Sequence, residues 1–367
     1  MLVFLLAATL ALFVVGVALP QTVAAAPAFW AHLVLGVGVM TLITAAMQHF
    51  VPVLTRGRGA GVWLARLPWL MLVAGVLASL VFLGILPGAV LSAAAALALF
   101  GVGVMLVWMR GMTRRCLGPA HPGLAWYGAA LVCLGLGLLT VPAMQWWPAA
   151  HGALRAFHFH INLYGFVGLT AIGTLQVLLP TAAGKPDPGV AIRLRQDLKW
   201  ALIGAVSIAF GQAGVPGLAG LGVAAWAWPL LRLALAWLRL YGRDLFRLHG
   251  NLPVLAAALL GYAGALVTSL DGGGRVEGPL TVFLPGFLFA LVSGAAAQLA
   301  PVWLGQGADS AVHRAGQIRL ARYGGVRALL FLCSALLPVL GYRCAGMPGL
   351  TALFWFLILF AIWLYRD

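Results

Sequence analysis

Charged side chains are scarce in this chain of 367 residues: they make up 8% of it, and only seven are Asp or Glu. A soluble globular domain carries about 25% charged residues, so the composition excludes that class. Hydrophobic residues account for 63% of the chain, and its mean hydropathy is +1.04. We therefore expect a single integral membrane domain over residues 1–367, with no soluble domain at either end.

The few acidic residues all fall outside the apolar runs. They are Asp187, Asp197, Asp244, Asp271, Glu277, Asp309 and Asp367. Carboxylates inside membrane spans are typical relay groups of proton pumps. Since no predicted span contains one, we expect no proton pumping.

Cysteine is also rare, with four residues at Cys116, Cys133, Cys333 and Cys344. None belongs to a CxxC or CxxCH motif, which excludes a thioredoxin-like redox site and covalent c-type haem attachment. Cys133 and Cys333 fall inside apolar runs and are expected to pack as small hydrophobic side chains.

Apolar runs of about 20 residues, the length that crosses a bilayer, recur along the whole chain. Twelve helices are predicted, over residues 1–19, 28–54, 63–86, 88–109, 123–144, 155–183, 198–215, 218–241, 250–270, 279–304, 325–342 and 347–365. The first run lacks the basic start of a signal peptide, so it is kept as a helix. The predicted fold class is all-α, a polytopic membrane protein.

Basic residues gather in alternate loops, after the second, fourth, sixth, eighth and tenth runs. They are Arg56, Arg58 and Arg66; Arg110, Arg114 and Arg115; Lys185, Arg193, Arg195 and Lys199; Arg239, Arg243 and Arg247; and Arg314, Arg319 and Arg322. The positive-inside rule then predicts both termini on the cytoplasmic side of a bacterial inner membrane. Anionic lipid accounts for the net charge of +15, so the lipid bilayer is the expected partner and nucleic acid is not.

Three of the predicted helices share polar residues and a proline at similar positions. The shared residues are His32, Gln48 and Pro52 in the run 28–54, His160, Gln176 and Pro180 in the run 155–183, and Gln298 and Pro301 in the run 279–304. The copies are offset by about 128 and 122 residues, which predicts three four-helix units arranged as parallel repeats.

A histidine inside hydrocarbon is costly unless it is paired, faces the bundle interior or holds a metal or cofactor. His32, His158 and His160 are predicted near the external surface. Positions 158 and 160 lie about 200° apart around a helix, so their side chains cannot both face one small site. His160 shares a helix face with Tyr164.

The helix number, the cytoplasmic termini and these histidines resemble subunit I of the haem–copper oxidases and the related NnrS-like membrane proteins. In the oxidases a histidine on the second helix ligates the low-spin haem, and His32 occupies that place. Their sixth helix carries a copper-ligating His followed four residues later by Tyr, the spacing of His160 and Tyr164. The resemblance implies haem or copper chemistry.

The chain also departs from these families. The oxidases have a His pair on the seventh helix and two haem-ligating histidines near the start of the tenth, whereas the runs 198–215 and 279–304 contain none. NnrS-like chains tend to carry WHxHE where this one reads FWAHLVLG. These departures indicate a divergent relative that is not a pumping oxidase.

We expect a b-type haem in the external half, since such a haem needs one or two imidazoles and cations for its propionates. The expected ligands are His32 and His160, or His158 in place of His160, with His151 as a further metal ligand, Tyr164 beside the ring, and Arg155 and Arg343 for the propionates. Asn162 and Tyr164 are the expected partners of the remaining imidazole nitrogens on the sixth helix. The expected function is redox or diatomic-gas chemistry involving nitric oxide or oxygen, with a redox partner or quinol and a homodimer as candidate partners.

Two other function classes stay open. The external histidines could handle copper together with Met105, Met109 and Met112, although these methionines are predicted on the opposite side of the membrane. Alternatively, the chain is a cofactor-free transporter or scaffold, in which His32 and His160 bond to each other, to water or to backbone carbonyls. Fold analogy alone does not choose among these classes.

Overall fold

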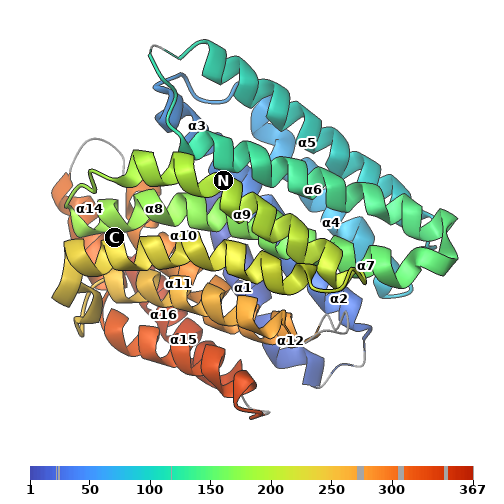
Figure 1. Ribbon diagram of the computed structural model, residues 1–367. Helices are drawn as coiled ribbons and strands as arrows, with labels where there is room; N and C mark the ends of the chain where they lie inside the picture. The colour runs from blue at the N-terminus through green and yellow to red at the C-terminus, as the bar shows by residue number, and fades with distance from the viewer. Residues whose placement is uncertain are drawn as a thin grey trace.

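The computed structural model describes the chain except residues 22, 24, 117, 271–276, 305–309, 343–345 and 367. Within the described residues, all regular structure is helical, and the long helices run side by side as one bundle (Figure 1). In chain order the α-helices are α1 Leu2–Ala18, α2 Pro27–Ala31, α3 Thr41–Thr55, α4 Leu67–Phe82, α5 Val90–Arg114, α6 Gly123–Trp146, α7 His151–His160, α8 Gly168–Ala183, α9 Val190–Gln212, α10 Leu218–Tyr241, α11 Leu252–Thr268, α12 Glu277–Val282, α13 Phe289–Leu304, α14 Ser310–Leu320, α15 Gly324–Val339 and α16 Gly346–Arg366.

Eight helical stretches of the described residues are long and apolar enough to cross a membrane. They are Pro27–Thr55, Leu64–Phe82, Val90–Arg114, Gly123–Trp146, Pro148–Ala183, Leu218–Phe246, Pro279–Leu304 and Gly346–Tyr365. A ninth arises if Ala311–Leu320 and Gly324–Pro338, which meet at 45°, form one bent span. The chain is therefore an all-helical, membrane-embedded protein.

Three of the long stretches contain a π-helical segment between two α-helical parts. The segments are η2 His32–Met40 between α2 and α3, η5 Ile161–Val167 between α7 and α8, and η7 Phe283–Leu288 between α12 and α13. Each following α-helix has a proline in its last two turns, at Pro52, Pro180 and Pro301. A π-helical turn inserts extra backbone into a helix and is common at functional sites.

The helix α9 begins earlier than predicted, and this corrects the placement of one acidic residue. The sequence puts Asp197 in a loop, but it lies within α9, fully buried, with Oδ1 2.5 Å from Nη1 of Arg232 on α10. The buried carboxylate is tolerated because a guanidinium from the next helix compensates its charge. Arg193, Arg195 and Lys199 also lie on α9, not in a loop.

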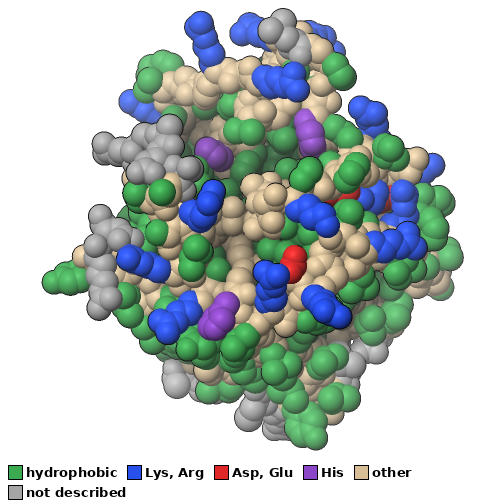
Figure 2. All heavy atoms as spheres, turned by 90° about the vertical axis from the view of Figure 1, so that its left-hand side faces the viewer, with side chains coloured by type: hydrophobic (Ala, Val, Ile, Leu, Met, Phe, Trp, Pro, Cys, Tyr) green, Lys and Arg blue, Asp and Glu red, His purple; other side chains and the backbone are tan. Residues whose placement is uncertain are grey.

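The basic loops lie together at one end of the bundle. Hydrogen bonds join neighbouring loops in pairs. The backbone N–H of His121 donates to Leu54 O at 3.4 Å, Lys185 Nζ donates to Leu240 O at 2.7 Å, and the backbone N–H of Gly250 donates to Ala321 O at 3.0 Å. Figure 2 views the end where Figure 1 places α14, and Lys and Arg side chains gather around it. The sequence prediction that the alternate basic loops share one side agrees with this arrangement.

Candidate functional site

His32 occupies the first residue of the π-helical segment η2. Its Nδ1 is 2.8 Å from the carbonyl oxygen of Ala28, one turn earlier, so Nδ1 carries the proton and donates it to that oxygen. The ring lies 4.6 Å from the ring of Phe82 on α4 and 6.3 Å from that of His158, measured between ring centres. The planes of the two imidazoles differ by 19°.

His158 lies near the end of α7, facing α6. Its Nδ1 is 2.7 Å from the carbonyl oxygen of Gly137 and 3.2 Å from Oγ1 of Thr140. Because the Thr140 hydroxyl donates its own proton to Gly137 O, the imidazole is the donor in both contacts. His158 therefore also has its proton on Nδ1.

His160 is the last residue of α7, immediately before η5, and is fully buried. Its Nδ1 is 2.8 Å from the carbonyl oxygen of Ala156, the same one-turn contact that His32 makes. Its Nε2 is buried without a hydrogen-bond partner. The ring contacts Phe159 at 5.0 Å edge-on and Tyr164 at 6.1 Å, with its plane tilted 24° from that of Tyr164.

Tyr164 faces the interior of the bundle and is fully buried. Its hydroxyl donates to the carbonyl oxygen of Ala265 at 2.7 Å and lies 2.5 Å from Oγ of Ser269, both from the end of α11. The rings of Tyr262 and Phe283 pack edge-on against it. The hydroxyl of Tyr164 is thus bonded to α11, and Tyr164 meets His160 only through the contact between their rings.

One expectation about these histidines is wrong. Asn162 and Tyr164 do not bond to the imidazoles of the sixth predicted helix, because backbone carbonyls take both Nδ1 protons; the Asn162 amide donates to His158 O at 2.8 Å. The imidazole nearest in the structure to that of His32 is His158, the residue that the sequence offers in place of His160. As the 200° spacing predicts, His158 and His160 face different neighbours.

No hydrogen bond or ring contact joins the remaining predicted site residues that the structure describes to these three histidines. His151 and Arg155 are exposed on α7, and the contact of His151 is a long one, with Nδ1 3.5 Å from Met144 O. Arg343 lies outside the described residues. Met105 and Met109 are buried on α5, and the described residues hold no cluster of three His, Cys, Asp or Glu side chains that could bind a metal ion.

The glycines beside the histidines bring helices together. A Cβ on Gly165 would lie 2.7 Å from Cβ of Cys133, and one on Gly168 would lie 2.3 Å from the hydroxyl of Tyr262. Gly36 packs against Gly75 of α4 in the same way. Neighbouring atoms therefore occupy the space above these glycines.

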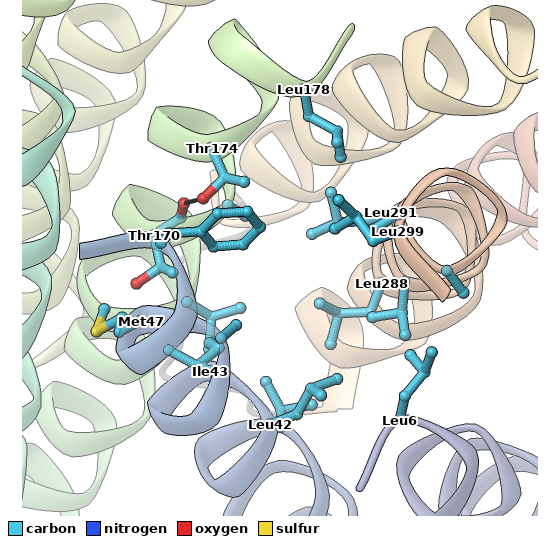
Figure 3. A pocket seen from close by; sticks show the side chains of 18 of the residues that line it. Leu6, Leu42, Ile43, Met47, Thr170, Thr174, Leu178, Leu288, Leu291 and Leu299 are labelled. Carbon is cyan, nitrogen blue, oxygen red and sulfur yellow. Dashed lines mark hydrogen bonds between the residues drawn. The ribbon is translucent and has the colours of Figure 1, made fainter. Parts of the chain in front are cut away.

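A cavity of about 110 Å³ lies between helices of the bundle (Figure 3). It is lined mainly by apolar side chains of α3, α8 and α13, the three helices that follow the π-helical segments. Its few polar lining residues include Thr170, and Tyr127 with Thr174, whose hydroxyls are 2.9 Å apart. His32, His158 and His160 do not line it. The sequence carries no signal for this cavity, since its walls are ordinary apolar residues.

The geometry thus provides three imidazoles with a fixed tautomer. Each has its proton on Nδ1, bonded to a backbone carbonyl, and presents Nε2 as its free nitrogen.

In comparisons with known proteins, no family model and no curated sequence matches this chain.

Proposed function

We propose that this protein is a membrane-embedded haem b protein that acts in electron transfer or in diatomic-gas chemistry, and that it does not pump protons. One observation carries the proposal: His32, His158 and His160 all donate Nδ1–H to a backbone carbonyl at 2.7–2.8 Å, which leaves Nε2 as a neutral ligand nitrogen. Metal-ligating histidines nearly always have the other ring nitrogen bonded in this way.

The ligand set fits a haem better than it fits a bare metal ion. A protein-bound transition metal usually needs three or four side-chain ligands, and the described residues offer no such cluster. A haem supplies four nitrogens to its iron and requires one or two imidazoles from the protein. When bound, the group would supply one-electron redox chemistry or a site for a gas molecule.

The protein's own residues would then position the ligands and exclude water. Backbone carbonyls of Ala28, Gly137 and Ala156 hold the imidazole protons, so each ring keeps one orientation and one tautomer. Arg155, exposed one turn from His158, is available for a propionate.

The proposal extends to topology: twelve spans in three four-helix units, with both termini cytoplasmic. Its support is the recurrence of the π-helical segments in the three runs that the sequence aligns, each followed by a helix with a proline in its last two turns. The helices α3, α8 and α13 line one cavity, as repeated units around a common axis would. The proposed relationship is to the haem–copper oxidase subunit I and NnrS-like superfamily. It rests on His32 in the second predicted helix and on His160 and Tyr164 in the sixth.

The absence of pumping is proposed because Asp197 is committed to an ion pair. Its Oδ1 binds Arg232, and the pair lies at the basic end of the bundle, on the first half of α9. A carboxylate whose oxygen is held in an ion pair is a poor proton relay because that oxygen is not free to pass a proton on.

The test is the visible spectrum and pyridine haemochrome of the full chain, purified after expression with haem supply. We expect a Soret band and a b-type haemochrome. A protein without haem but with bound copper would support the copper class, and a protein with neither would support the cofactor-free scaffold. Rapid oxygen consumption with a reduced donor would overturn the exclusion of an oxidase.

A further inference from the structure

Building on the proposed haem function, we propose that the haem is ligated by His32 and His158 together, one imidazole on each side of the iron. The two residues come from η2 and α7, which are far apart in the sequence. Their ring centres are 6.3 Å apart and their planes differ by 19°. Both rings present Nε2 as the free nitrogen, since both Nδ1 atoms are bonded to carbonyls.

The separation of the rings matches the requirement of a shared metal. A metal–imidazole nitrogen bond is about 2.0 Å long, and the ring centre lies about 1.1 Å beyond that nitrogen, so two imidazoles on opposite sides of one metal have centres about 6.2 Å apart. The observed 6.3 Å agrees with this value. The ring centres of His32 and His158 are also farther apart than those of His32 and Phe82, which are in contact at 4.6 Å.

His160 is the weaker candidate for the second ligand. Its ring neighbours are Phe159 and Tyr164, and its surroundings are fully buried. His32 and His158 are only half-buried, so their rings are more accessible to a ligand than the ring of His160. The exposed Arg155 lies on that same helix, three residues before His158.

This ligation narrows the function. Two imidazoles occupy both axial positions of a haem iron, and no position is left for a gas molecule. The haem at this site would therefore be six-coordinate and low-spin and would transfer electrons. The haem would also link η2 to α7.

The experiment compares the wild-type chain with His32→Ala, with His158→Ala and with His160→Ala, which removes the alternative second ligand. The exposed His151→Ala is the matched control on the same helix. Each is expressed with haem supply and measured by pyridine haemochrome and by electron paramagnetic resonance of the oxidised protein. We expect a low-spin signal in the wild type, in the control and in His160→Ala. In His32→Ala and His158→Ala we expect haem content to fall about tenfold or more, or the remaining haem to become high-spin.

A fold defect is separated from a ligand defect by chemical rescue. Imidazole added to His158→Gly should restore the low-spin signal, and imidazole added to the control His151→Gly should change nothing. If the wild type holds haem and His158→Ala keeps its low-spin signal, or if imidazole restores no signal in His158→Gly, the proposed pair is wrong while the haem function stands. If the wild type holds no haem, the proposed function fails and the ligand pair fails with it.

Discussion

The contact between η2 and α4 offers a sharp test of how His32 is positioned. Gly36 lies one turn after His32, and Gly75 of α4 packs directly on it. A Cβ built on Gly75 would be 2.6 Å from the carbonyl carbon of Gly36 and 2.7 Å from its oxygen. Both atoms belong to the backbone and cannot rotate away, so Gly75→Ala must push the two helices apart.

The size of the effect follows from these distances. Ordinary contact of a Cβ begins at 3.4 Å, so the helices must separate by about 0.8 Å. Overpacking of this kind costs about 1–3 kcal/mol, which for a chain of 367 residues corresponds to a fall in Tm of roughly 1–4 °C. Since η2 carries His32, the same shift should change the distance between that imidazole and the imidazole of His158 and lower the haem content.

The assay is thermal unfolding of the purified chain in detergent, with Gly103→Ala as the control. Gly103 lies in α5, and a methyl group added to it would meet no atom within 4 Å, so there the alanine should raise stability by about 0.5–1 kcal/mol. The reasoning is refuted if Gly75→Ala unfolds at or above the wild-type temperature while Gly103→Ala gives the expected gain.

Three further predictions concern other parts of the molecule. Arg232→Ala should destabilise the chain by about 3–5 kcal/mol in thermal unfolding because it leaves the buried Asp197 unpaired, whereas Ala at the exposed Arg239 of the same helix should change stability by less than about 0.5 kcal/mol; equal effects would contradict the ion pair. Tyr164→Phe should cost about 1 kcal/mol through the lost bond to Ala265 O but leave the haem content unchanged, and loss of haem would instead show that the hydroxyl takes part in the site. Burial, with a smaller contribution from Arg195, lowers the pKa of His121 below its usual 6.5, and its neutral Nδ1 accepts the N–H of Gly123 at 3.1 Å. The unfolded chain then binds more protons than the folded one below about pH 6.5, so stability should fall as the pH drops through this range, and His121→Asn, which can still accept that N–H, should flatten the Tm–pH curve.

The sequence by itself determined the class of this protein. With so few charged residues, the chain can bury its surface only in lipid and in itself, and long apolar helices follow from that requirement. The alternation of basic loops predicted that those loops share one side, and the spacing of positions 158 and 160 predicted that their side chains diverge. The polar residues shared by three apolar runs picked out the same three stretches that contain π-helical segments. These features are local or periodic, so they can be read along the chain.

The tertiary structure decided which apolar faces meet. Hydropathy indicates which helix faces are apolar. It does not indicate which of two similar apolar faces a given helix contacts, because that choice depends on how the side chains pack. The sequence leaves both His160 and His158 open as the partner of His32, and packing of η2 and α7 against their neighbours brings His32 to His158. The predicted start of the seventh run at residue 198 left Asp197 outside it, because its charge opposes a membrane span when read alone. Arg232, 35 residues further on, compensates that charge, and only the packed helices α9 and α10 bring the two side chains together.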